Sequence, residues 1–568
     1  MVELAETSLI SLGEDFSCVF DDVLTQTKQH KLVERLWQKD TTLWSSDADT
    51  QEKIAHRLGW LDSLERVAGT LGDVQAWVNT ARDAGYRDVL LLGMGGSSLC
   101  PLVLAEVFVE DTQGLNVHVL DTTDALTIER MTQDLDWSKT IVVLASKSGG
   151  TIEALSLYAY CRSLADAKTK FVAITDPQTS LVALAKRDGF AQCLENPADI
   201  GGRYSALSHF GFFPALCLGI DFKAYAEHVD LMLKACQIDV EENPGLELAV
   251  FMAAAHRSGR DKLCLEVGDS LKCFPLWIEQ LVAESLGKKG KGVIPVAGAE
   301  LDTFAATQRD RCIVAIGDAQ ELETIRQKHQ ANMQNGTPLL TIEVKAPHQL
   351  GAEFFRWEMG TALAGFFLEV NPFDEPNVTE SKMLTQEILA EYASEGRLRT
   401  QPVLASSEHL ELYGTLDWGL VAEPGAVLDV LRAFVGQAEP NDFIGLLAYL
   451  SYAEQEAFVL ADLRRTLSSG GGWLTTLGYG PRFLHSTGQL HKGGANNGVF
   501  IQLTCADGVH LPIPGVDYSF GVLKSAQAAG DMRALEKHGR RVLRCHCKST
   551  VEEGLTELKD LFKQIFTG

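Results

Sequence analysis

The feature that most constrains the fold of this chain is a series of short, continuously apolar runs that alternate with helical segments. Four such runs lie at residues 88–93, 115–120, 140–146 and 170–175. A strand that is apolar throughout is buried on both faces, which is typical of a parallel sheet covered by helices on both sides. The pattern therefore predicts a doubly wound α/β domain over residues 81–245.

A similar alternation continues toward the C-terminus. The clearest helical pattern there is at residues 353–370, and apolar strand candidates lie at residues 262–267, 312–317 and 339–344. These features predict a second α/β domain of the same kind over residues 246–420.

Both ends of the chain differ from this middle part. Residues 1–80 carry apolar residues at helical spacing, which predicts an N-terminal helical segment. Residues 508–535 are laid out as a strand, a loop and a helix, like residues 338–365, and this weak internal repeat predicts a smaller α/β region over residues 421–568. The predicted fold class is therefore α/β, with two doubly wound parallel-sheet domains, a C-terminal α/β region and the N-terminal helices.

The charge of the chain limits its partners. With 50 basic and 76 acidic residues its formal net charge is −26, which argues against binding to nucleic acid or to an anionic membrane. An anionic small molecule is still compatible, provided that positive charge is concentrated locally. The longest apolar stretch, at residues 210–220, is too short to span a bilayer and contains a proline.

The cysteines indicate a reducing compartment. The 12 cysteines come with no signal peptide in the sequence, so we expect reduced thiols and a cytoplasmic protein. Cys545 and Cys547 flank His546, but no second cluster of cysteine or histidine supplies four ligands, so we expect no metal.

The first strand ends in a glycine-rich turn that is suited to an anion. Gly95, Gly96 and Ser97 follow the apolar run directly, and backbone N–H groups in such a turn can face a bound anion. A dinucleotide-binding turn is the alternative, because Asp121 follows the next strand where a ribose-binding acid is expected. Ser98 replaces the third glycine of that motif, and a tight turn without any ligand remains equally compatible.

A second polar loop favours the anion site. Ser146, Lys147, Ser148 and Thr151 follow another strand of the same predicted sheet, and ligands of open α/β sheets bind at that edge. Hydroxyl groups, a lysine and the N-terminus of the next helix together suit a phosphate group. The plainer alternative is a hydroxyl-rich helix cap beside a solvated lysine. A third loop presents Arg203 after two glycines, where it could hold a carboxylate or stabilise an oxyanion.

These motifs, in this order, resemble those of the glucose-6-phosphate isomerase family. The chain carries GMGGSS at residues 93–98, SKSGGT at 146–151 and IGGRYS at 200–205. Residues 277–295 are similar to the family segment with the catalytic base, and residues 371–382 to the segment with the catalytic lysine. Five weak motifs in order are a far more specific signal than any one of them. The segments LWQKD and HRLGWLD also resemble the isomerase half of bacterial transaldolase–isomerase fusion proteins.

The resemblance implies sugar-isomerase (SIS) domains of the doubly wound type and a reaction. The family interconverts glucose 6-phosphate and fructose 6-phosphate by a cis-enediol proton transfer, without metal or cofactor. Glu284 would be the base that moves the proton between C2 and C1, and Arg203 would stabilise the enediolate. Seen alone, Glu284 would be a solvated helix residue. Lys288, Lys289 and Lys291 then form a solvated loop or add positive field.

One family element is displaced. The shorter bacterial enzymes carry a histidine element soon after the glutamate segment, whereas residues 299–308 here contain no histidine. The similar stretch RFLHSTGQLHKGGANNG lies far downstream, at residues 482–498. We therefore expect His485, together with Lys382, to exchange protons with the sugar during ring opening. His491 and His348 are the alternatives.

Two other functions stay open at this stage. One is an isomerase of the same fold that acts on a mannose or amino-sugar phosphate, and the other is a non-catalytic sugar-phosphate sensor. Family members are commonly dimers, but the C-terminal region could replace those contacts within one subunit, so a homodimer is one alternative and the oligomeric state stays open.

Overall fold

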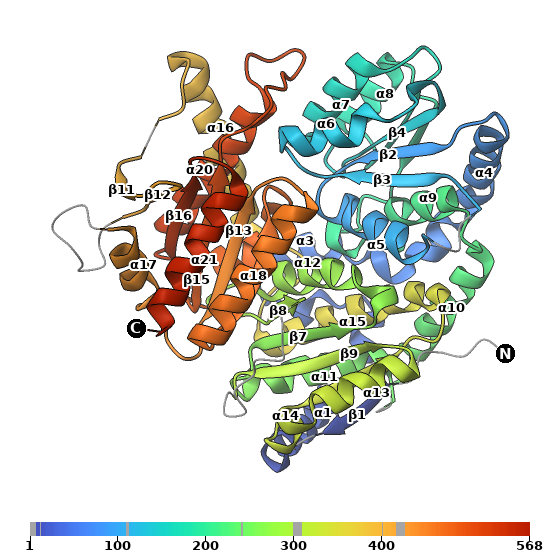
Figure 1. Ribbon diagram of the computed structural model, residues 1–568. Coiled ribbons are helices and arrows are strands. Elements are labelled where there is room, and N and C mark those ends of the chain that lie inside the picture. Colours follow the sequence, from blue (N-terminus) through green and yellow to red (C-terminus); the bar gives the residue numbers. More distant parts are fainter. Residues whose placement is uncertain are drawn as a thin grey trace. The chain divides into compact units, whose positions relative to one another are not determined.

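The structure is a computed structural model in which two compact units are distinguished (Figure 1). It describes residues 7–11, 13–109, 113–239, 242–298, 309–399, 401–415 and 426–567. Unit 1 comprises Met1–Asp121, Leu135–Ala297 and Ala306–Asp374, and unit 2 comprises Thr122–Asp134, Gly298–Ala305 and Glu375–Gly568.

The first sheet of unit 1 confirms the four leading strand predictions. All of its strands are parallel, in the order β3-β2-β4-β5-β6. Its strands are β2 (Asp88–Leu92), β3 (Asn116–Leu120), β4 (Thr140–Ala145), β5 (Lys170–Thr175) and β6 (Gln192–Glu195). The strand order reverses between β2 and β4, and such a switch point opens a crevice at the carboxyl ends of the two strands. Helices following these strands are α5 (Leu99–Val107), α6 (Ala125–Gln133), α7 (Ile152–Leu164) and α8 (Ser180–Arg187).

The second sheet of unit 1 has the order β1-β10-β9-β7-β8 and is parallel except for β1. Its strands are β1 (Thr7–Ser11), β7 (Lys262–Val267), β8 (Ile294–Ala297), β9 (Arg311–Gly317) and β10 (Leu339–Glu343). Residues 262–267, 312–317 and 339–344 were predicted as strands, and this is confirmed. The accompanying helices are α9 (His209–Leu218), α10 (Phe222–Ala235), α11 (Pro244–Arg257), α12 (Phe274–Leu286), α13 (Ala319–Lys328), α14 (Gln330–Gln334) and α15 (Leu350–Leu368).

The N-terminal segment is helical from residue 14 onward, as predicted. It forms α1 (Glu14–Gln29), α2 (Leu32–Trp37), α3 (Ala48–Ala55) and α4 (Ser63–Asp83), with 3-10 turns at Thr41–Leu43 and Gly59–Asp62. The prediction of helix is wrong for Thr7–Ser11, which pair antiparallel with β10 and extend the second sheet. Pairing to an open sheet edge depends on a distant strand and leaves no local signal in the sequence.

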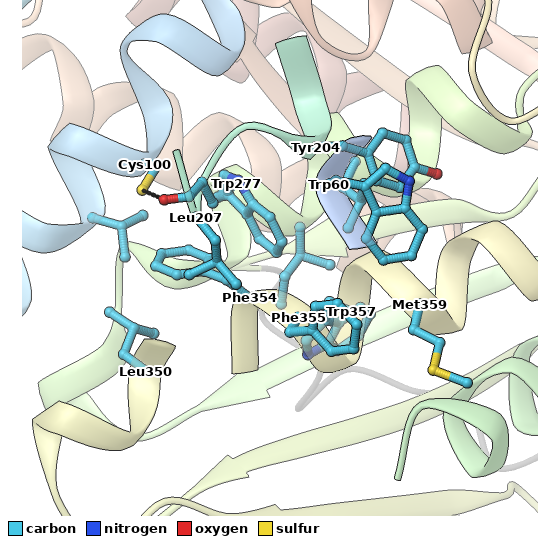
Figure 2. Packing of buried hydrophobic residues seen from close by; sticks show 14 of the residues in the cluster. Trp60, Cys100, Tyr204, Leu207, Trp277, Leu350, Phe354, Phe355, Trp357 and Met359 are labelled. Carbon is cyan, nitrogen blue, oxygen red and sulfur yellow. Dashed lines mark hydrogen bonds between the residues drawn. The ribbon is translucent and has the colours of Figure 1, made fainter. Parts of the chain in front are cut away.

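One long apolar helix lies at the centre of unit 1. The side chains of α15 are buried almost all round, and the hydrophobic cluster around it includes residues of both sheets, such as Val89 and Val314. Figure 2 shows Phe354, Phe355 and Trp357 of α15 near Trp60 of the N-terminal segment and Tyr204. The Trp60 and Tyr204 rings are 5.3 Å apart between centroids, so the N-terminal helices share the core of the sheets.

Unit 2 holds a third sheet, of order β11-β12-β16-β15-β13-β14. Its strands are β11 (Val403–Ser406), β12 (Leu410–Tyr413), β13 (Phe443–Tyr449), β14 (Leu474–Tyr479), β15 (Gly498–Cys505) and β16 (Arg541–Cys547). Strands β13 to β16 pair in parallel, and β11 and β12 pair antiparallel at one edge. Its helices are α16 (Pro376–Glu395), α17 (Val427–Val435), α18 (Glu454–Gly471), α19 (Gly488–Gly493), α20 (Phe520–Lys537) and α21 (Val551–Thr567), together with α6.

The predicted strand at the start of residues 508–535 is wrong. The strand of that region is β15, and residues 506–519 are loop apart from an isolated bridge between Pro512 and Ser519. Pro512 and Pro514 lack the N–H groups that a central strand needs. The α/β fold class with parallel sheets is confirmed. None of the helices in the described part of the chain is long and apolar enough to cross a membrane.

Candidate active site

The glycine-rich turn after β2 lies at the switch point and contacts the Arg203 loop. Gly95–Ser97 form a 3-10 turn, and so do Gly202–Tyr204. A side-chain Cβ at Gly96 would lie 1.9 Å from the Gly202 carbonyl oxygen, so only glycine allows this approach. Gly95, Gly96 and Ser97 are all buried.

The SKSGGT loop after β4 has the geometry of an anion site. The hydroxyl oxygens of Ser146 and Thr151 are 2.9 Å apart, and Ser148 accepts a 3.4 Å hydrogen bond from the Gly150 N–H. Thr151 is the N-cap of α7, yet its side chain makes no capping hydrogen bond to the helix. The Thr151 hydroxyl therefore does not cap α7, as the plainer alternative had required. The Ser146 and Thr151 hydroxyls thus lie together at the N-terminus of α7, where helix N–H groups favour an anion.

Gly149 has a conformation that holds this loop against the next one. Its φ is +69°, and a Cβ there would lie 2.8 Å from that of Thr179. Ser180 donates a hydrogen bond to the Gly149 carbonyl oxygen at 3.0 Å. Glycine is therefore required by both backbone and space.

Lys147 is held by an acidic partner. Its ammonium group forms an ion pair with Asp176 and donates to the Ala198 carbonyl oxygen at 3.0 Å. Burial lowers the pKa of Lys147 and raises the pKa of Asp176, and the ion pair opposes both shifts. Asp176 directly follows β5 and so lies at the same sheet edge, but none of the motifs indicated it.

Glu284 lies near the end of α12 and is almost completely buried, with 7% of its surface exposed. Its Oε1 is 3.4 Å from Nη1 of Arg203, and its Oε2 accepts a 3.1 Å hydrogen bond from Gln280. Gln280 was not among the predicted residues. Because it lies one helical turn before Glu284, the spacing of four residues was a signal that could have found it.

Arg203 connects the base to the loop that precedes α16. Its Nε donates to Ser285 Oγ at 2.9 Å, and its Nη2 donates to the carbonyl oxygens of Pro372 and Asp374 at 2.8 and 2.7 Å. The side chain is 4% exposed, so the guanidinium is fixed in a buried position. Lys288 reinforces the same loop through the Asn371 carbonyl oxygen at 2.6 Å and the Asp374 carboxylate at 2.7 Å. The sequence suggested either a solvated loop residue or an added positive field for Lys288. The structure supports neither, because Lys288 is buried in this contact.

The other predicted catalytic residues belong to unit 2. Lys382 is exposed on α16, and His485 is half-buried in the 3-10 turn Arg482–His485. Within unit 2 the helix α16 packs against that turn and against α19. The structure therefore groups Glu284, Arg203 and the phosphate loop in one unit, and Lys382 and His485 in the other.

The alternative histidines have different surroundings. His491 is buried between Phe483 and Phe500, and burial lowers its pKa well below the usual value. His348, in unit 1, packs its ring edge-on against Phe108 at 5.6 Å. A buried aromatic setting does not suit proton exchange with a substrate, so His491 is disfavoured and His485 stays the prediction.

The Cys545–His546–Cys547 stretch does not form a metal site. It lies in β16, where successive side chains point to opposite faces, and Cys545 and Cys547 belong to the hydrophobic core. His546 instead contacts the Thr504 hydroxyl at 2.9 Å. Across the described ranges, no group of three or more metal-binding side chains is present.

A buried carboxylate in contact with an arginine and a glutamine, in the same unit as a hydroxyl-rich loop at the end of a parallel strand, is compatible with the sugar-phosphate isomerase class. Comparison with known proteins identifies the family. Residues 35–304 match the model of the phosphoglucose isomerase family. Over this segment the chain is therefore similar to the glucose-6-phosphate isomerases.

Individual relatives agree with this. The chain is 28% identical over 432 residues to the glucose-6-phosphate isomerase of Nostoc punctiforme, covering 67% of this chain and 80% of the relative. It is 29% identical over 385 residues to that of Thermus thermophilus, covering 59% of this chain and 90% of the relative.

Solved structures support the fold. A hypothetical protein of Thermus thermophilus, TT0462, is 26% identical with a TM-score of 0.58 and covers 67% of this chain and 100% of its own. A glucose-6-phosphate isomerase from Chlamydia trachomatis has a TM-score of 0.55 at 17% identity, covering 70% of this chain and 90% of its own, and shows the shared fold. The family recognised from the five motifs is confirmed. The particular likeness to fusion proteins stays a prediction.

Proposed function

We propose that this protein is a glucose-6-phosphate isomerase of glycolysis and gluconeogenesis. The carrying observation is the buried Glu284 carboxylate, 3.4 Å from Arg203 and 3.1 Å from Gln280, in the same unit as the SKSGGT loop. A base fixed on both oxygens and a neighbouring guanidinium are what proton transfer between adjacent carbons needs.

In this proposal the phosphate group is bound first. Ser146, Ser148 and Thr151 donate hydroxyl hydrogen bonds, with Lys147 and the backbone of Gly95, Gly96 and Ser97 completing the subsite. Binding energy from this remote group positions the reacting carbons.

The proton transfer then uses Glu284. Its carboxylate removes the proton from C2 of the open sugar and returns it to C1, while Arg203 stabilises the negative charge that develops on the enediolate oxygens. Lys382 and His485 exchange protons with the ring oxygen and a hydroxyl during ring opening. None of these steps calls on a metal or a cofactor.

The proposed function also includes a cytoplasmic location. All 12 cysteines are free thiols, as expected for a cytoplasmic enzyme of sugar metabolism. A homodimer is part of the proposal, and light scattering of the purified chain tests it.

The experiment is a coupled assay that converts fructose 6-phosphate to glucose 6-phosphate, repeated with mannose 6-phosphate. Glu284→Gln should lower kcat by at least about a thousandfold and leave sugar-phosphate affinity close to wild type. Turnover retained in that variant would remove Glu284 as the base. Activity only with mannose 6-phosphate would favour the alternative isomerase, and binding without any turnover would favour a sensor.

A further inference from the structure

The N-terminal helical segment is bound to the loop that presents Arg203. Leu58 forms an antiparallel bridge with Ile200, and the Gly59 N–H donates to the Asp199 carbonyl oxygen at 3.0 Å. Trp60 then packs on Tyr204, as Figure 2 shows, and Tyr204 directly follows Arg203 in the chain. Residues 57–60 therefore run beside residues 199–204.

Arg57 is the charged side chain of residues 57–60. Its Cδ lies 3.6 Å from where a Cβ of Gly201 would be, so the arginine lies along the glycine pair of the loop. Lys147 reaches the same loop from the other side, through the Ala198 carbonyl oxygen at 3.0 Å. Arg57 and Lys147 thus flank one short stretch of backbone, residues 198–201.

The two charges influence each other. Burial lowers the pKa of Lys147 against the ion pair with Asp176, and the Arg57 charge lowers it further. Burial raises the pKa of Asp176, and Lys147 and Arg57 oppose that rise. Arg57 is therefore close enough to act on both members of the pair.

Arg57 differs from the other charged side chains near residues 198–201, because they are paired with an opposite charge. Lys147 is neutralised by Asp176, and Asp199 is neutralised by Arg66, whose Nη1 is 2.7 Å from the carboxylate. Arg57 forms no ion pair with a carboxylate of the described residues, and its hydrogen bond goes to the His56 carbonyl oxygen at 3.4 Å. It is an uncompensated positive charge near Lys147, whose loop would receive a phosphate dianion of charge about −1.5 to −2.

We propose that Arg57 is a phosphate-binding residue of this site, supplied by the N-terminal helical segment. This inference rests on the proposed sugar-phosphate subsite and adds a residue and a role for the first 80 residues. Without Arg57, the hydroxyls and amides of the loop would hold the dianion with no net positive charge nearby, because Lys147 is paired with Asp176 and Arg66 with Asp199. With it, the subsite gains a guanidinium whose planar donors match phosphate oxygens.

The test measures binding of inorganic phosphate to the full chain by calorimetry at low salt. Arg57→Gln should raise the Kd for phosphate by about tenfold or more, the effect of losing one charge-assisted contact. Arg57→Lys keeps the charge and should fall between the two. Lys53→Gln is the matched control, because it removes an equal charge from an exposed position on the helix α3, which ends shortly before Arg57, and should bind like wild type.

Two results would overturn the proposal. One is an Arg57→Gln protein that binds phosphate as tightly as the Lys53→Gln control. The other is a loss in Arg57→Gln that is equally large at low and at high salt, which would mean that the side chain acts by packing on Gly201 and not by its charge. Since phosphate binding needs no turnover, absence of isomerase activity in the wild type would count against the proposed function alone.

Discussion

At the residue scale, Glu358 is an ionisable side chain that the chain buries completely, in the middle of α15. Burial raises the pKa of Glu358 well above its usual 4.5, and the Ala206 amide only partly opposes this. The folded protein therefore holds a proton that the unfolded chain releases, so stability falls as the pH rises from about 4.5 toward the folded pKa.

Glu358→Gln keeps the shape and removes this titration. Relative to the variant, the wild type should lose up to about 1.4 kcal/mol of unfolding free energy per pH unit, measured by urea unfolding between about pH 5 and pH 8. Glu369→Gln, an exposed residue that caps the same helix, should keep the wild-type slope. Parallel slopes for Glu358→Gln and wild type would mean that Glu358 is ionised in the fold.

At the scale of elements, the site depends on how closely the 3-10 turns Gly95–Ser97 and Gly202–Tyr204 approach. Gly96→Ala places a Cβ 1.9 Å from the Gly202 carbonyl oxygen, so the two turns must separate. We expect a loss of about 1–3 kcal/mol in stability, seen as a lower Tm, together with a higher KM for the sugar phosphate.

The same substitution in the other turn is the control. A Cβ at Gly202 meets no atom within 4 Å, so Gly202→Ala should keep both Tm and KM near wild type. Equal effects of the two variants would show that glycine is needed in these turns for its flexibility and not for the close approach.

The elements that could be predicted from the sequence are those with a local signal. Strands such as β4 are continuous apolar runs, and the helix α15 has a long apolar pattern, so both were found with bounds close to the observed ones. The edge strand β1 and the bridge between Leu58 and Ile200 depend on residues far away in the chain. For the same reason the motifs indicated Glu284 and Arg203 but not their link through Ser285 and the loop 372–374.

At the scale of the whole molecule, the chain crosses between its units more often than its motifs suggest. The boundary predicted at residue 245 runs between two sheets that share one hydrophobic core. The helix α6 belongs to unit 2, although the strands β3 and β4 that flank it belong to unit 1. Composition and periodicity do not report such crossings, because α6 has the pattern of any helix that follows a strand.

A buried ion pair fixes α6 in unit 2. Lys524 of α20 donates to Asp124 at 2.8 Å and is 2.5 Å from Asp507, with the Lys524 and Asp124 side chains only 3% and 4% exposed. Burial alone would lower the pKa of Lys524, but the two carboxylates raise it above its usual value. Asp124 also accepts from the Thr127 N–H at 2.9 Å, so one carboxylate both caps α6 and binds α20.

Lys524→Met should therefore destabilise unit 2, because it leaves Asp124 buried without its cation, at a cost of about 3–5 kcal/mol. Hydrogen exchange of peptides from β15 should accelerate, whereas β4 in unit 1 should keep its protection, since each unit is compact by itself. Lys537→Met removes an exposed lysine from the same helix and should change neither. If β4 lost protection together with β15, the two units would unfold as one. The Lys524–Asp124 ion pair would then stabilise both units and not unit 2 alone.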